Sequence, residues 1–157
     1  IIRGPLVMLG YHGRPEATAD VLGSEGWLHT GDVAYLDEGG HAFIVDRLKD
    51  MIITAGYNVY PAEIERVVAA HPDVAMVAVG RRPDAVKGEI AVAYVVVRAG
   101  ASPGADAILG FCGDRLAAYK RPRDVVFVDQ LPTTSSGKLM RRKLSELDPA
   151  LTAGRIA

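Results

Sequence analysis

The sequence has little cysteine, no long hydrophobic run and no excess of charge of either sign. One cysteine, Cys112, among 157 residues excludes an internal disulfide framework and is typical of a reducing compartment. No apolar run approaches the roughly 20 residues of a membrane-spanning helix, and no signal peptide is recognisable. Lys and Arg number 18 against 19 Asp and Glu, so no strong field attracts nucleic acid or an anionic membrane. These absences predict a cytoplasmic protein that binds no nucleic acid.

The composition is that of a globular protein. Hydrophobic residues make up 49% and charged residues 24% of the chain, whereas disordered chains are poorer in apolar groups. The length suits one domain, or a small domain with part of a neighbour. The chain begins Ile1-Ile2-Arg3-Gly4, without an initiator Met, so we expect that it was cut from a larger protein.

Hydrophobic patterning predicts an α+β fold in which helices flank a small, mostly antiparallel sheet. Residues 4–26 are rich in Gly and Pro and predict a loop with one short strand. Gly39-Gly40 predicts a tight hairpin turn, because glycine accepts positive φ. The expected strands are 33–37, 41–45, 51–54, 74–79, 89–97 and 125–128, the last of them followed by a loop over 132–138.

Two helices are expected between these strands. Pro61 opens the first at its favoured position, and His71-Pro72 ends it. Ser102-Pro103 supplies the N-cap and first position of the second. Their expected buried faces are Ile64, Val67 and Val68 in the first helix, and Ile108, Phe111, Cys112 and Leu116 in the second.

Three polar segments could carry chemistry, and each also has a plain structural explanation. Lys138 follows Ser-Ser-Gly, so its ammonium could reach a phosphate or carboxylate in a cleft, or it is a solvated lysine at a loop tip. Tyr119-Lys120-Arg121-Pro122-Arg123 could stack a base and bind phosphates, or form a surface turn after a helix. Thr30-Gly31-Asp32 offers a carboxylate for two ribose hydroxyls, or is a simple turn.

Other familiar sites are excluded by spacing. The four histidines share no metal-ligand spacing, and Cys112 has no cysteine partner, so we expect no metal site. Gly137-Lys138 is not a Walker loop, because the first glycine of that motif is missing. No segment has the glycine context of a Ser/His/Asp hydrolase. The residues alone therefore predict an α+β domain with a presented lysine and a basic turn.

Taken together, the polar segments resemble the adenylate-forming superfamily, which includes acyl-CoA synthetases, adenylation domains of peptide synthetases and firefly luciferase. The resemblance extends from Gly4 to Lys143, with four spaced motifs in register. These motifs are Gly26-Trp27-Leu28-His29-Thr30-Gly31-Asp32, Asp46-Arg47-Leu48-Lys49-Asp50-Met51-Ile52, Gly56-Tyr57-Asn58-Val59-Tyr60-Pro61-Ala62-Glu63-Ile64-Glu65, and Tyr119-Lys120-Arg121-Pro122 with residues 132–141.

The resemblance implies an acid-thiol ligase. Such an enzyme condenses a carboxylic acid with ATP to an acyl-adenylate and then passes the acyl group to a thiol, usually that of coenzyme A. Residues 1–46 would be the end of the large AMP-binding domain, and residues 47–157 the mobile C-terminal domain. The phosphate loop, the acid pocket and the ligands of Mg²⁺ would belong to the large domain, so this chain alone is not expected to turn over.

The resemblance also implies roles for single residues in the first half-reaction. Asp32 would accept both ribose hydroxyls of AMP, and Arg47 would support the same ribose. Lys49 stands at the hinge position, where an exposed charged residue can rotate without uncovering core. Lys138 would bridge the acid's carboxylate and the α-phosphate as charge builds there. Asp46 stands where many members have glycine, a departure that affects none of these roles.

A second set would serve transfer to coenzyme A. Gly56 would line the pantetheine tunnel, where a side chain would block the thiol. Tyr57, Tyr119 and Arg121 would be cofactor-binding, the last two at the adenine and phosphates of coenzyme A. The run from Gly56 to Pro61 is similar to medium- and long-chain fatty acyl-CoA synthetases, which suggests a fatty acid substrate.

Two other functions remain open at this point. An acyl-AMP ligase would load a carrier protein through the same tunnel, without the nucleotide that Tyr119 and Arg121 meet. A non-catalytic module would use the domain as a binding or regulatory partner, although the retained Lys138 argues against it.

Overall fold

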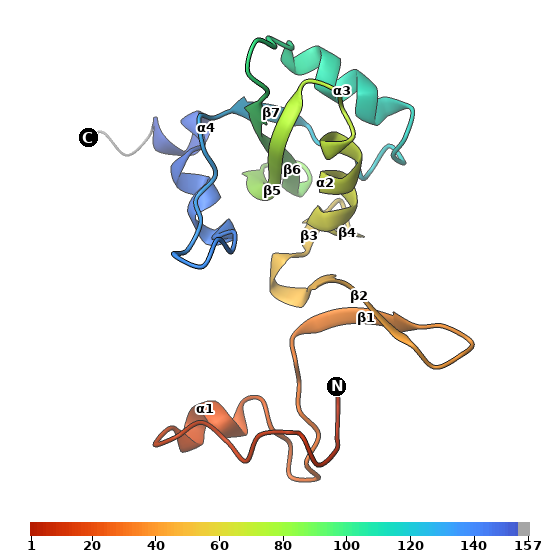
Figure 1. Ribbon diagram of the computed structural model, residues 1–157, viewed down its shortest axis with the longest axis vertical. Helices are drawn as coiled ribbons and strands as arrows, with labels where there is room; N and C mark the ends of the chain where they lie inside the picture. The colour runs from red at the N-terminus through yellow and green to blue at the C-terminus, as the bar shows by residue number, and fades with distance from the viewer. Residues whose placement is uncertain (154–157) are drawn as a thin grey trace. The chain divides into compact units, whose positions relative to one another are not determined.

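The computed structural model describes residues 1–153. The chain divides into two compact units, Ile1–Lys49 and Asp50–Ala157 (Figure 1). The first unit holds one short helix and one hairpin, and the second holds a sheet with helices packed on it.

The first unit is built around a two-stranded antiparallel hairpin. It contains α1 (Pro15–Ala19), β1 (Asp32–Leu36) and β2 (Ala42–Arg47), and the 3₁₀ helix η1 (Leu48–Asp50) follows β2. The hairpin runs from Leu36↔Ala42 to Asp32↔Arg47 with a bulge at Val33/Ala34. Gly40 adopts φ 81°, so the expected glycine turn is confirmed.

This unit has no hydrophobic core of its own. In residues 1–49, all of which the structure describes, Asp46 is the only buried residue. Leu6 and Leu9 are 99% and 100% exposed, and Leu36 and Ile44 of the hairpin are each 70% exposed.

The second unit contains a five-stranded sheet in which four strands follow the order β4-β3-β6-β5 and β7 pairs with β6. The β6–β7 pair is parallel, and the remaining pairs are antiparallel. Its strands are β3 (Ile52–Thr54), β4 (Tyr57–Val59), β5 (Val74–Asp84), β6 (Gly88–Val97) and β7 (Asp124–Phe127). The expected α+β fold with a small, mostly antiparallel sheet is therefore confirmed.

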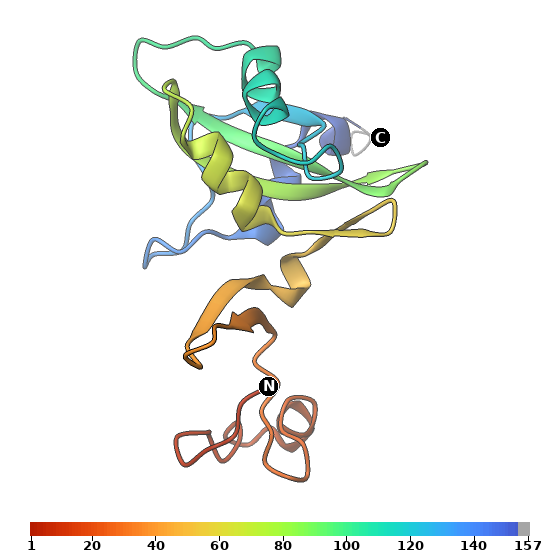
Figure 2. The same ribbon diagram turned by 90° about the vertical axis from the view of Figure 1, so that its right-hand side faces the viewer.

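Alternation along β6 divides the interior of this unit into two cores. Ala91, Ala93 and Val95 face a core covered by α2 (Pro61–Ala69) and α3 (Ala105–Gly113). Val92 and Tyr94 face the other side, where η2 (Arg141–Glu146) packs through Leu144, ahead of α4 (Pro149–Thr152). Figure 2 shows α2 and α3 on one side of the sheet and the C-terminal segment on the other. Burial on both faces explains the continuous apolar run of β6, whereas β5 leaves Met76 53% exposed.

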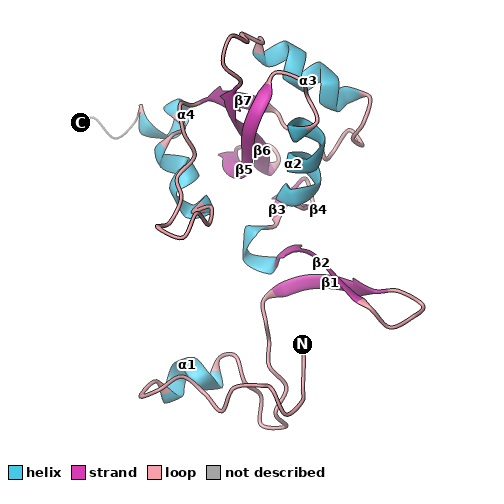
Figure 3. Cartoon of the chain, viewed as in Figure 1, coloured by secondary structure: helices cyan, strands magenta, loops and turns pink. Residues whose placement is uncertain are grey.

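Some expected boundaries are wrong, for local reasons. The second helix begins at Ala105 with Gly104 as its N-cap, so Ser102 lies before it. Figure 3 shows a loop leading into α3. Residues 4–26 contain α1, opened by Pro15, where a loop and a strand were expected. The polar residues Arg81–Asp84 continue β5 because they pair with β6 down to Gly88. Strand β4 was not expected, since three residues carry too little pattern.

Candidate functional site

Lys138 sits on a loop that its own backbone hydrogen bonds close. Thr133 and Leu139 form an antiparallel bridge, and the Thr134 N–H donates to the Lys138 carbonyl at 2.8 Å. The Lys138 N–H donates in turn to Thr134 Oγ1 at 3.1 Å. Gly137 adopts φ 79°, which lets the chain reverse before the lysine. Lys138 is exposed, and its ammonium forms no hydrogen bond or ion pair with the part of the chain that the structure describes.

Arg141, three residues after Lys138, fastens this loop to the sheet. Its guanidinium forms a two-pronged pair with Glu65 of α2, with Nη2 at 2.8 Å from Oε2. Nη1 also donates to the Val79 carbonyl at 2.9 Å, and Nε lies 3.5 Å from Asp50 Oδ2. Glu65 accepts the Val79 N–H at 2.7 Å as well. A planar guanidinium suits this arrangement, because it presents paired donors to one carboxylate.

Asp32 and Arg47 meet in the first unit. The hairpin places them opposite each other, and Arg47 Nε lies 2.9 Å from Asp32 Oδ1. Asp32 follows Gly31, which adopts φ 73°, and its N–H donates to Thr30 Oγ1 at 3.1 Å. The buried Asp46 accepts the Arg47 N–H at 2.8 Å. The structure thus brings together the two residues expected at the ribose.

Gly56 lies in the tight turn between β3 and β4. Both central residues of this turn have positive φ, 49° at Ala55 and 83° at Gly56, as a two-residue hairpin requires. A Cβ at Gly56 would meet no atom within 4 Å. Backbone conformation, not crowding within the described chain, therefore favours glycine here.

Tyr57 and Tyr119 form a stacked pair beside this turn. Their ring centroids lie 4.6 Å apart at an interplanar angle of 24°, and the residues are 55% and 39% exposed. Lys120 Nζ lies 5.8 Å from the Tyr119 ring and donates to both Glu63 oxygens, at 2.7 and 2.8 Å. The hydrogen bond with Glu63 raises the pKa of Lys120 above its ordinary value. The result is an exposed aromatic surface with the Lys120–Glu63 ion pair at its edge.

Arg121 Nε donates to the Leu116 carbonyl at 3.0 Å and not to either tyrosine. This hydrogen bond ties the arginine to the loop after α3. The ion pair beside the Tyr57–Tyr119 stack is formed by Lys120 and Glu63. Their proximity depends on the packing of α2 against the loop after α3, which no spacing in the sequence reveals.

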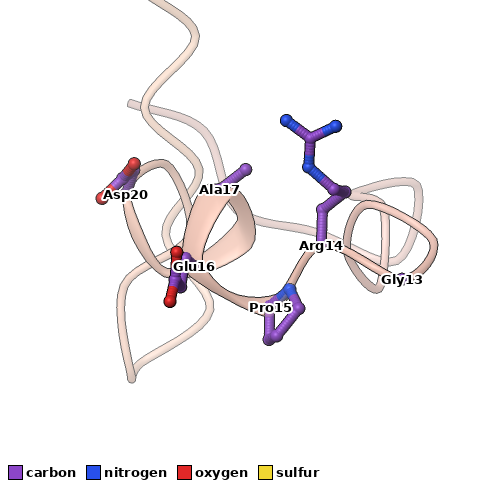
Figure 4. A pocket seen from close by; sticks show the side chains of 6 residues that line it. All are labelled: Gly13, Arg14, Pro15, Glu16, Ala17 and Asp20. Atoms are coloured by element: carbon purple, nitrogen blue, oxygen red, sulfur yellow. The ribbon is translucent and has the colours of Figure 1, made fainter.

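A pocket elsewhere contains none of these residues. It lies around α1 in the first unit, as Figure 4 shows, and is lined by Gly13, Arg14, Pro15, Glu16, Ala17 and Asp20. Among residues 1–153, no three His, Cys, Asp or Glu side chains gather as a metal site would require. Within the same residues, no helix has the length and apolar character of a membrane span.

Comparison with known proteins relates the second unit to one domain family. Residues 63–138 match the model of the AMP-binding enzyme C-terminal domain. A propanoyl:CoA ligase from Rhodococcus jostii, whose acyl group carries a methyl-dioxo-octahydroindenyl ring, is 50% identical over 146 residues, which is 93% of this chain and 28% of the ligase. A long-chain-fatty-acid–CoA ligase from Bacillus subtilis is 44% identical over 146 residues, 93% of this chain and 26% of the ligase.

A solved structure shows the same fold. The o-succinylbenzoate CoA synthetase of Bacillus subtilis, in complex with its acyl-adenylate intermediate, superposes with a TM-score of 0.83 at 39% identity, over 90% of this chain and 29% of that one. The chain thus spans between a quarter and a third of the length of these proteins. The acids named in the three proteins differ in size, ring content and polarity.

Proposed function

The chain carries the AMP-binding enzyme C-terminal domain of the adenylate-forming superfamily, and from this membership we propose that it works as part of an ATP-dependent acid-thiol ligase. The ligase would join a carboxylic acid to ATP as an acyl-adenylate, release pyrophosphate, and pass the acyl group to coenzyme A. A cytoplasmic location belongs to the same proposal, on the grounds of the single cysteine, Cys112.

The observation that carries this proposal is the presentation of Lys138. A lysine with no function beyond solubility needs no ordered support, whereas this one is held by a closed loop and fastened by Arg141. Its ammonium is exposed and makes no ion pair within residues 1–153. It is therefore available to a negatively charged substrate.

In the first half-reaction, a carboxylate oxygen of the acid attacks the α-phosphorus of ATP and the bond to pyrophosphate breaks. Negative charge builds between the attacking carboxylate and the α-phosphate oxygens. Lys138 would lie against both groups and stabilise this charge, an effect that is worth about 10²–10³ in rate for one well-placed donor. Asp32 would accept the ribose hydroxyls, with Arg47 holding its carboxylate in place at 2.9 Å.

In the second half-reaction, the sulfur of coenzyme A attacks the acyl carbonyl, its proton is lost, and AMP leaves. The pantetheine arm would pass Gly56, where a Cβ meets nothing in this chain and would instead obstruct the thiol. The adenine of coenzyme A would lie on the Tyr57–Tyr119 pair, and Lys120 would offer charge to the phosphates. Arg121 would reach the same phosphates through the nitrogens that Leu116 does not occupy.

Between the two steps the C-terminal domain would turn about Lys49. We propose that residues 1–46 end the large domain and residues 47–157 form the mobile one. The compact units divide directly after Lys49, which supports a pivot at this residue. By the same resemblance, the ligands of the Mg²⁺ that accompanies ATP would belong to the large domain.

We propose a medium- or long-chain fatty acid as the substrate. The fatty-acid ligase of Bacillus subtilis supports this choice, together with the run from Gly56 to Pro61. That run lies outside the expected acid pocket, so the choice depends on similarity and not on a contact.

The test is thioester formation by the full-length protein with ATP, coenzyme A and acids from acetate to palmitate, read by mass spectrometry. We expect Lys138→Ala to lower acyl-adenylate formation by about 10²–10³. Lys143→Ala is the matched control, because Lys143 is an exposed lysine on η2 and should leave the rate unchanged. Equal rates for wild type and Lys138→Ala would refute the role of the lysine.

The same measurement identifies the acceptor. Acyl-AMP that accumulates without thioester would favour a ligase that loads a carrier protein, and Arg121→Ala should then leave loading untouched. If neither product forms, the domain is a binding module.

A further inference from the structure

The turn that carries Gly56 has little stability of its own. Ala55 adopts φ 49°, a left-handed conformation that side chains with a Cβ avoid. The flanking strands β3 and β4 have three residues each, and a two-stranded hairpin of this size is marginal in water. Something outside the hairpin must hold Ala55 and Gly56 in place.

The tip of the β5–β6 hairpin supplies this support through three consecutive residues. The Ala55 N–H donates to the Lys87 carbonyl at 2.8 Å. Thr54 pairs with Gly88 across the sheet. The Ile53 N–H donates to Glu89 Oε2 at 2.9 Å. Each residue leading into the turn is thus held by one residue of the 87–89 segment.

The tip is in turn fixed by two carboxylates. Asp84 Oδ1 accepts the Lys87 N–H at 2.7 Å and the Val86 N–H at 3.0 Å. These backbone hydrogen bonds lower the pKa of Asp84, the bond from Lys87 first. Arg81 lies 3.5 Å from Glu89 Oε1 and leaves Oε2 to Ile53. The carboxylates therefore hold the backbone that holds the Ala55–Gly56 turn.

We propose that Asp84 and Glu89 are positioning residues for the thiol-transfer step, because they fix the turn past which the pantetheine arm enters. This inference rests on the proposed function of Gly56. Neither carboxylate touches the Lys138 loop in the described contacts, so the adenylation step should not depend on them.

The experiment compares four variants of the full-length protein with wild type: Asp84→Ala, Glu89→Ala, Asp84→Asn and Val86→Ala. Acyl-adenylate formation is followed by pyrophosphate exchange, and thioester formation by kcat and KM for coenzyme A. Hydrogen exchange at the Ala55 amide is measured by NMR in this 157-residue chain and in the chain carrying each substitution.

We expect Asp84→Ala and Glu89→Ala to lower kcat/KM for coenzyme A by about tenfold, since a displaced binding element misplaces the reacting groups. Acyl-adenylate formation should stay within about twofold of wild type, since Asp84 and Glu89 have no described contact with the Lys138 loop and its position should not change. Exchange at Ala55 should speed up in Asp84→Ala while the unfolding midpoint of the chain stays constant. Asp84→Asn keeps an oxygen acceptor and should restore most of the loss. Val86→Ala is the matched control, because Val86 is 91% exposed at the same tip.

Several results would overturn the inference. Equal losses in both half-reactions would show general destabilisation, and wild-type kinetics in both alanine variants would show that the tip does not matter. Unchanged exchange at Ala55 in Asp84→Ala would refute the support of the turn, whatever the activity. If wild type forms no thioester, the proposed function fails, and the exchange measurement still tests whether Asp84 holds the turn.

Discussion

Asp148 is a fully buried carboxylate, and it accepts hydrogen bonds from three residues. Arg82 of β5 donates to it from Nε at 2.7 Å and from Nη2 at 2.9 Å. The Tyr94 hydroxyl donates at 3.1 Å, and the Ala150 N–H at 3.0 Å caps α4. One carboxylate thus ties the C-terminal segment to two strands of the sheet.

We predict that Asp148→Ala lowers the free energy of unfolding by about 3 kcal/mol, because Arg82, whose side chain is only 14% exposed, loses its inner partner. Asp124 is the matched control: it pairs with the same guanidinium at 2.7 Å, but its side chain is 44% exposed. Asp124→Asn should cost less than about 1 kcal/mol, since water replaces a lost partner there. Urea unfolding of the three proteins measures both values, and equal costs would contradict the ranking.

The same carboxylate predicts a dependence of stability on pH. Burial alone would raise the pKa of Asp148, but the hydrogen bonds from Arg82, Ala150 and Tyr94 outweigh it and lower the pKa below the ordinary value. The stabilisation is therefore complete above about pH 4, where the unfolded carboxyl ionises, and is lost as pH falls through the lower folded pKa. The difference in unfolding free energy between wild type and Asp148→Asn should be constant from pH 5 to 7. This difference should shrink below about pH 4. A difference that grows on acidification would refute the assigned role of the Asp148 carboxylate.

At the scale of elements, η2 depends on one arginine. Arg141→Ala would leave the Glu65 carboxylate, 18% exposed at its side chain, without the guanidinium that it shares with Val79. We predict a loss of about 2–4 kcal/mol in unfolding free energy, because a half-buried charge stays unpaired. Arg142→Ala, at the exposed neighbour, should change it by less than about 0.5 kcal/mol. Calorimetry that finds the two variants alike would contradict this anchoring.

The elements that could be predicted from the sequence are those whose signal lies within their own residues. The Gly39-Gly40 hairpin, the Pro61 helix and strand β6 carry their signal locally, and all three are present. The end of β5 and the strand β4 carry little local pattern, and neighbouring strands hold them in the sheet. The pairing of Tyr57 with Tyr119 depends on packing between distant segments, which patterning along one strand or helix cannot reveal.

At the scale of the whole molecule, the hydrophobic cores lie in the second unit only. The two cores involve residues from Ile52 to Leu147, whereas residues 1–49 bury no apolar side chain. Burial of apolar surface is the main favourable term in folding, so the first unit has little to offset the entropy of ordering its backbone. The exposed Tyr35–Phe43 stack, with centroids 5.1 Å apart, is a small local exception in this unit.

We predict that the two units of this chain differ widely in local stability. Amides of β6, with a core on both faces, should exchange at the rate of global unfolding, and those of β1 and β2 at least about 100-fold faster. Hydrogen exchange of the 157-residue chain, resolved by peptide, measures this directly. A chain comprising residues 50–157 is the control, and its urea midpoint should match that of the whole chain because no core residue is removed. Protection of β1 and β2 equal to that of β6 would show that the hairpin is stabilised by more than its own contacts.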